Sequence, residues 1–194
     1  MTARLANLKG SRHSLRASIR RMTIRLVVLA LALLVGSTSA RADVVDRGPN
    51  GFTVRTAVTI AAPPDRVFAT LVRVGEWWDP AHTWSGDARN LRLDATPGGC
   101  FCEALPAGGG VRHAEVVYVE SGKLLRLNGS LGPLQSMGVN GSLTWQLEKS
   151  GEGTAATVTY VVGGYVPGGA DALAAPVDGV MAIQIRRLKA LLER

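Results

Sequence analysis

Alternation of hydrophobic and polar residues is the clearest pattern in the chain, and it predicts strands over most of its second half. Leu143, Trp145 and Leu147 alternate with polar neighbours, as in an antiparallel strand with one buried face. Six further segments are alternating or rich in β-branched residues and lie between Gly- and Pro-containing turns. These predicted strands are residues 53–60, 90–94, 100–105, 111–119, 124–127 and 154–162.

Two segments have helical spacing instead. Apolar residues within 67–72 follow Pro63, Pro64 and Asp65, which suit the first turn of a short helix. The apolar positions of 173–192 fall on one stripe of a long C-terminal helix. The order of elements predicts an α+β domain, with an antiparallel sheet of about six to seven strands and the long helix packed across one face.

The N-terminal region has the layout of a secretory signal peptide. Arginines precede the apolar run 26–35, and Ala40-Arg41-Ala42 follows as a small-x-small cleavage site. We therefore expect a signal peptide over 1–42, cleaved after Ala42, then a flexible lead-in over 43–51 and a domain over 52–194. The run is too short for a spanning helix, so no stable membrane anchor is expected after cleavage. An uncleaved anchor, a start at Met22 and twin-arginine export remain alternatives.

Charge is distributed very unevenly between these parts. Eight of the 22 basic residues and none of the 15 acidic residues lie in 1–42, so the remainder carries 14 basic and 15 acidic residues. A near-neutral domain lacks the positive surface that nucleic-acid binding requires, so no nucleic-acid partner is expected. Phosphate-binding loops, nucleophile elbows and His-Glu-x-x-His stretches do not occur, and we expect no cofactor.

Together, these features resemble the START-like helix-grip superfamily, which includes the polyketide cyclase/dehydrase and lipid-transport (SRPBCC) group. The opening Ile60 and 62–68 (Ala-Pro-Pro-Asp-Arg-Val-Phe) are similar to that family. The tract 98–103 (Gly-Gly-Cys-Phe-Cys-Glu) and the pair 77–78 resemble its chaperone-ATPase-activator-like branch. The resemblance covers 52–194. It implies a curved sheet wrapped around the C-terminal helix and a cavity between them for an apolar ligand. It implies no catalytic residue.

An aromatic cluster supplies the candidate ligand contacts. Three of the four tryptophans lie within eight residues, beside a histidine. Aromatic walls with a polar tip are typical of apolar pockets, although core packing explains such a cluster equally well. The candidate ligand-binding residues are Trp77, Trp78, His82, Trp84, Phe101, His113, Met137 and Trp145. The Gly-rich tract 131–138 is either a lid over the cavity or an ordinary hairpin connection.

Acid–base chemistry has two candidates, His113 and Glu103. The alternating pattern places His113 on one strand face with Glu115, and Glu103 lies on a neighbouring strand. A His–Glu pair inside a pocket would suit general acid–base catalysis, but we favour a partly exposed structural pair. Arg112 and Arg126 would bind a carboxylate if they pointed inward; the favoured expectation is that they face solvent.

Cys100 and Cys102 leave three alternatives open. Their Cα atoms would be about 6.5 Å apart in a regular strand, near the upper limit for a disulfide. An oxidising periplasm favours a bridge, and His82 or His113 would complete a zinc site. We favour two packing thiols, and no metal is expected.

Three functions therefore remain in contention. The leading hypothesis is a periplasmic or secreted single-domain protein that binds a small hydrophobic or amphipathic ligand. The second is a cyclase, dehydratase or isomerase that acts on a polyketide-like or aromatic compound. The third is a protein-interaction module.

Overall fold

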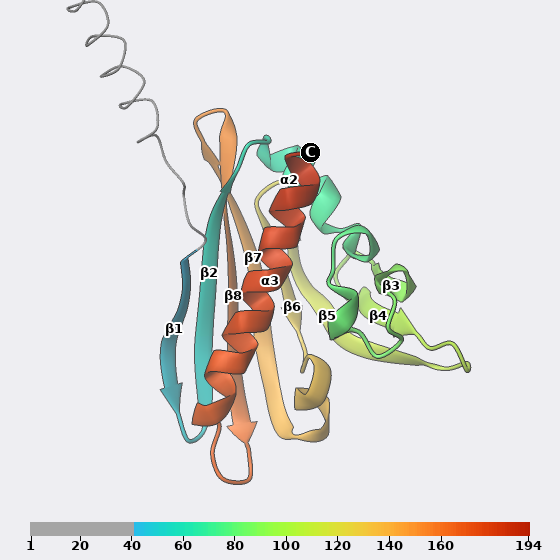
Figure 1. Ribbon diagram of the computed structural model, residues 1–194, viewed down its shortest axis with the longest axis vertical. Coiled ribbons are helices and arrows are strands. Elements are labelled where there is room, and N and C mark those ends of the chain that lie inside the picture. Colours follow the sequence, from blue (N-terminus) through green and yellow to red (C-terminus); the bar gives the residue numbers. More distant parts are fainter. Residues whose placement is uncertain (1–40) are drawn as a thin grey trace, which may run out of the picture. The chain divides into compact units, whose positions relative to one another are not determined.

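An eight-stranded antiparallel sheet forms the framework of the domain in the computed structural model, which describes residues 41–194 (Figure 1). Its order is β1-β2-β8-β7-β6-β5-β4-β3. The seven predicted strands are all present, and an eighth, β1, precedes them. The strands are β1 Arg41–Gly48, β2 Gly51–Ile60, β3 Leu91–Leu93, β4 Cys100–Ala104, β5 Gly110–Glu120, β6 Leu124–Asn128, β7 Gly138–Ser150 and β8 Gly153–Tyr165.

Strand β1 corrects the prediction of a flexible lead-in over 43–51. It pairs antiparallel with β2, with Val44 opposite Val54. Most of its side chains are exposed, because it is an edge strand that the core does not cover. Its polar composition therefore reflects exposure, while backbone hydrogen bonds to β2 hold it in place. The signal-peptide prediction falls almost entirely outside the described residues, and a cut after Ala42 would leave most of β1 paired.

Two α-helices occur where the sequence predicts them. Helix α2 spans Pro64–Leu71 and begins with a proline, whose missing N–H costs nothing in a first turn. Helix α3 spans Ala174–Leu192 and runs across one face of the sheet (Figure 1). Its buried stripe includes Met181, Ile185, Leu188 and Leu192. The fold is thus the predicted α+β helix-grip arrangement, with the core between sheet and α3.

Short 3-10 turns connect α2 to the far edge of the sheet and are fixed to α3. They are η1 Val74–Glu76, η2 Pro80–His82 and η3 Ala88–Asn90. The Arg187 guanidinium donates to the Trp77 carbonyl at 2.9 Å, and the side-chain oxygen of Gln184 accepts from the Asp79 N–H at 2.9 Å. This connection places the segment after Asp79 over one end of the sheet.

A bulge in β5 reverses the predicted direction of one key side chain. Phe101 pairs with Ala114 but Cys102 pairs with Arg112, so His113 is the extra residue of the bulge. As a result, His113 and Ala114 are both buried, and Glu115 falls on the outer face. The prediction that His113 and Glu115 share a face is therefore wrong.

Strand β6 approaches this bulge closely just beyond its end. A Cβ atom on Gly129 would collide with the His113 carbonyl oxygen and with the backbone of Ala114. Only glycine fits here, so Gly129 allows the chain to leave the sheet beside the bulge and enter the turn η4, Gly132–Ser136.

Candidate functional site

A cavity of about 420 Å³ lies between α3, η4 and the inner face of the sheet. Helix α3 contributes one wall, η4 with its flanking residues a second, and the connection after Trp78 a third. Strands β4, β5 and β8 each add one residue. The lining residues are Trp78, Ala81, His82, Thr83, Trp84, Phe101, His113, Leu131, Gly132, Pro133, Leu134, Met137, Tyr160, Leu173, Pro176, Val177, Val180 and Met181.

Six of the eight predicted ligand-binding residues line this cavity: Trp78, His82, Trp84, Phe101, His113 and Met137. The other two, Trp77 and Trp145, do not. Their ring centroids lie 5.6 Å apart in edge-on packing, and both side chains are buried in the core. The indole N–H of Trp77 is satisfied by the carbonyl of Thr70. Core packing, the alternative interpretation, is correct for these two.

The resemblance implied that the C-terminal helix borders the cavity, but the sequence patterns did not identify which residues of α3 line it, and they missed Tyr160. Pro176, Val177 and Val180 belong to the apolar stripe of α3, and helical spacing cannot distinguish core contacts from cavity walls. The Tyr160 hydroxyl accepts from the Leu131 N–H at 3.1 Å and donates to the Gly129 carbonyl at 2.9 Å. Burial raises the pKa of Tyr160 to about 12. Its hydroxyl therefore remains protonated and joins β8 to the segment leading into η4.

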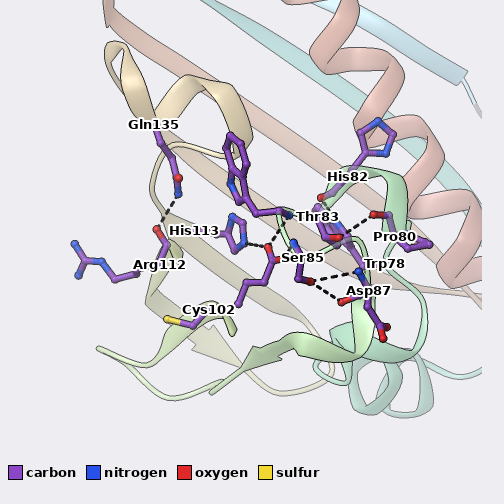
Figure 2. Close-up of polar contacts among 12 residues, drawn as sticks. Trp78, Pro80, His82, Thr83, Ser85, Asp87, Cys102, Arg112, His113 and Gln135 are labelled. Atoms are coloured by element: carbon purple, nitrogen blue, oxygen red, sulfur yellow. Dashed lines mark hydrogen bonds and ion pairs between the residues drawn. The ribbon is translucent and has the colours of Figure 1, made fainter. Parts of the chain in front are cut away.

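Glu103 is a buried carboxylate held by main-chain donors. Glu103 is only 2% exposed. The N–H groups of Ser85 and Trp84 donate to its two oxygens at 2.5 Å and 3.1 Å, respectively (Figure 2). Burial favours the neutral acid, but hydrogen bonds from Ser85, Trp84 and His113 outweigh it and hold the pKa of Glu103 below its usual value. Glu103 is therefore ionised near neutral pH.

His113 completes a buried pair with Glu103. Its Nε2 atom lies 2.9 Å from Glu103 Oε2, and the two side chains are 6% and 0% exposed. The imidazole packs on Phe101 with centroids 5.0 Å apart. Burial lowers the pKa of His113, and the nearby Glu103 only partly offsets this effect. The favoured expectation of a partly exposed pair is wrong, because the bulge turns His113 inward beside Glu103.

The pair should make stability depend on pH in a defined direction. The folded protein holds the pKa of His113 below its ordinary 6.5 and that of Glu103 below 4.5, so the unfolded chain takes up protons first as pH falls. We expect the free energy of unfolding to fall in a first step below about pH 6.5 and a second below about pH 4.5. Urea unfolding measured from above pH 6.5 to below pH 4.5 tests these two steps. His113→Gln should remove the first step; an unchanged profile would contradict this.

The other polar candidates occupy the rim or the outer face. His82 lines the cavity, and its Nδ1 atom lies 2.9 Å from an oxygen of Asp79. Arg112 lies on the outer face and pairs with Glu115 at 3.0 Å. Arg126 donates to the Thr144 hydroxyl. Neither arginine lines the cavity, so the expectation that they point away from it is confirmed.

The tract 131–138 forms a wall of the cavity. It contains η4, and the Gln135 amide donates to the Arg112 carbonyl at 2.9 Å (Figure 2). The Ser130 hydroxyl donates to the Val139 carbonyl, which closes the base of this tract. The tract joins the neighbouring strands β6 and β7, as the hairpin interpretation predicts, and it also lines the cavity.

Cys100 and Cys102 form a disulfide, which corrects the prediction of two packing thiols. Their Cα atoms lie 5.4 Å apart, closer than the expected spacing of a regular strand. The two cysteines flank Phe101, where the register between β4 and β5 shifts. Both sulfur atoms are used, so the zinc hypothesis loses its ligands.

Comparison with known proteins places the chain in a family. Residues 51–193 match the family model described as polyketide cyclase / dehydrase and lipid transport. The chain therefore belongs to this family, within the predicted SRPBCC superfamily, and is a ligand-binding type of domain. No curated protein matches the chain. Among residues 41–194, no helix is long and apolar enough to cross a membrane.

Solved structures share the fold at low sequence identity. An uncharacterized protein from Rhizobium leguminosarum has a TM-score of 0.56 and 20% identity, over 77% of this chain and 99% of that one. CalU16 from Micromonospora echinospora has a TM-score of 0.55 and 13% identity, over 79% and 84%. Protein MLL2253 from Mesorhizobium loti has a TM-score of 0.54 and 20% identity, over 73% and 97%. These similarities support the fold.

Proposed function

We propose that this domain binds one small hydrophobic or amphipathic molecule in the cavity between the sheet and α3. The cavity carries the proposal: its volume of about 420 Å³ suits a small ligand, and aromatic and aliphatic side chains dominate its lining. No lysine or arginine is among the lining residues. Trp84, 55% exposed, stands at the rim, where it would contact an entering ligand.

Uptake of a neutral fluorescent probe tests this proposal. N-phenyl-1-naphthylamine brightens on leaving water, and we expect saturable binding with one probe per chain. A small apolar competitor such as naphthalene should displace it. Fluorescence that rises without saturation, or that naphthalene leaves unchanged, would oppose a defined cavity site.

A second candidate function is acid–base catalysis on a bound polyketide-like or aromatic compound. The observation that favours it is the buried pair of Glu103 and His113, because a neutral imidazole beside a cavity can accept a proton. In D₂O, the ketone 2-tetralone should then gain deuterium next to its carbonyl faster with the protein than with His113→Gln. Equal rates would leave the binding function alone.

Export to the periplasm or the medium is part of the proposal. The leader pattern over 1–42 motivates it, and a disulfide is typical of oxidising compartments. Expression of the full chain in bacteria should yield a product beginning at Asp43, with a mass about two daltons below its reduced form. Retention of residues 1–42, or alkylation of both cysteines without reductant, would contradict it.

A further inference from the structure

We propose that Glu103 fixes the tautomer of His113 so that the cavity presents one unpaired hydrogen-bond acceptor, Nδ1, to its ligand. The matching ligand is a neutral hydrophobic molecule with a donor group, such as a phenolic or enolic hydroxyl. This inference rests on the proposed binding function and specifies its ligand class.

The direction of the hydrogen bond between Glu103 and His113 follows from neighbouring main-chain groups that can only donate. Main-chain N–H groups of Trp84 and Ser85 donate to Glu103, and a backbone amide can only donate. These two hydrogen bonds to the carboxylate oxygens stabilise the charged form and hold the pKa of Glu103 low, so Glu103 is an anion. An anionic carboxylate in turn requires a proton on Nε2 of His113, 2.9 Å away. In a neutral imidazole this leaves Nδ1 without a proton, as an acceptor.

The buried polar side chains of Tyr160 and Trp78 in the cavity wall, and the hydroxyl of Thr83, are already paired, while Trp84 is exposed at the rim. The Tyr160 hydroxyl both accepts and donates, and the indole N–H of Trp78 donates to the His82 carbonyl at 3.0 Å. The Thr83 hydroxyl donates to the Pro80 carbonyl at 2.8 Å. The His82 side chain is 31% exposed at the rim, where water can satisfy its second nitrogen.

Nδ1 of His113 has no hydrogen-bond partner among residues 41–194. The fully enclosed side-chain atoms without a partner in that range are Thr56 Oγ1, Asp178 Oδ1 and Gln184 Nε2. Nδ1 of His113 is not among them, so this unpaired atom is not fully enclosed and has open space beside it. His113 lines this cavity and also a polar pocket beside Arg112 and Glu115, and we infer that Nδ1 opens into the cavity, where a ligand donor would pair with it. A ligand without a donor would displace water from Nδ1 and leave it unpaired, which weakens binding about tenfold to a hundredfold.

Two probes test the inference, because 1-methoxynaphthalene carries a methyl group in place of the hydroxyl hydrogen of 1-naphthol and so lacks the donor. We expect the protein to bind 1-naphthol at least about tenfold more tightly than 1-methoxynaphthalene, by calorimetric titration. In Glu103→Gln, we expect the amide oxygen to keep the shorter bond from Ser85. The amide NH₂ then takes the place of Oε2, where it loses the longer bond from the Trp84 N–H and donates to Nε2 of His113. The imidazole would then carry its proton on Nδ1, and the preference for 1-naphthol should be lost or reversed.

Nitrogen-15 NMR of the imidazole provides a readout that does not require ligand binding. The protein should show Nε2 protonated and Nδ1 unprotonated, and Glu103→Gln should show the opposite. Glu115→Gln is the control, because this outward carboxylate pairs only with Arg112 at the surface and should change neither the tautomer nor the preference.

The outcomes separate the inference from the proposed function. Equal affinity for both probes, or a proton on Nδ1 in the unaltered protein, overturns the inference and leaves hydrophobic binding standing. Binding of neither probe overturns both. The NMR of the unaltered protein decides the tautomer even if Glu103→Gln does not fold.

Discussion

Replacing Val177 with tryptophan is expected to abolish binding of N-phenyl-1-naphthylamine, with a loss of affinity of about a hundredfold or more. Val177 lines the cavity from the first turns of α3. An indole at this position would occupy the space that the ligand needs. Because that space is already open, the larger side chain should cost little packing energy compared with insertion into a filled core. Fluorescence titration measures the affinity.

The matched control is Ala175→Trp on the same helix. Ala175 is exposed and is not among the lining residues, so its tryptophan should leave probe affinity within about twofold. Both variants should keep the far-ultraviolet circular dichroism of the parent. Equal probe binding by Val177→Trp and the parent would place the binding site elsewhere.

Replacing Glu103 with alanine is expected to destabilise the fold by about 3–5 kcal/mol. The substitution leaves the N–H groups of Trp84 and Ser85 and the imidazole N–H of His113 without their acceptor. Each buried donor that loses its partner costs about 1–3 kcal/mol, reduced where water enters. Urea unfolding near pH 7.5 measures the free energy of unfolding.

Glu115→Ala is the matched control on the neighbouring strand. The Glu115 side chain is 44% exposed and pairs with Arg112 at the surface, an interaction worth about 0–1 kcal/mol. A similar loss for both alanine variants would show that the buried pair does not hold the connection over the cavity.

The sheet and helices were predictable because their signals are local. Alternation along residues 142–148 and the apolar stripe of α3 report directly which face is buried. Strand β1 was missed because an edge strand exposed on most of its surface has the composition of a loop. Its pairing with β2 depends on a free sheet edge, which is a property of the assembled fold.

Several residues of the site were predictable from the sequence, but the face of the strand to which His113 points was not. The sequence indicated Trp78, Phe101 and His113 as candidate ligand-binding residues, and all three line the cavity. It placed His113 beside Glu115, because alternation assumes an unbroken strand. One bulge residue reverses that assignment. Bulges depend on pairing with a neighbouring strand, so hydrophobic periodicity alone does not show them.

Native mass spectrometry of the protein, purified without detergent and titrated with 1-naphthol, tests the central claim most directly. We expect a single adduct per chain, lost on denaturation and absent from Val177→Trp, or a co-purifying molecule of one defined mass that naphthol displaces. A protein that carries no molecule and takes up no naphthol, or that binds it equally well with Val177 replaced, would contradict a ligand-binding cavity between the sheet and α3.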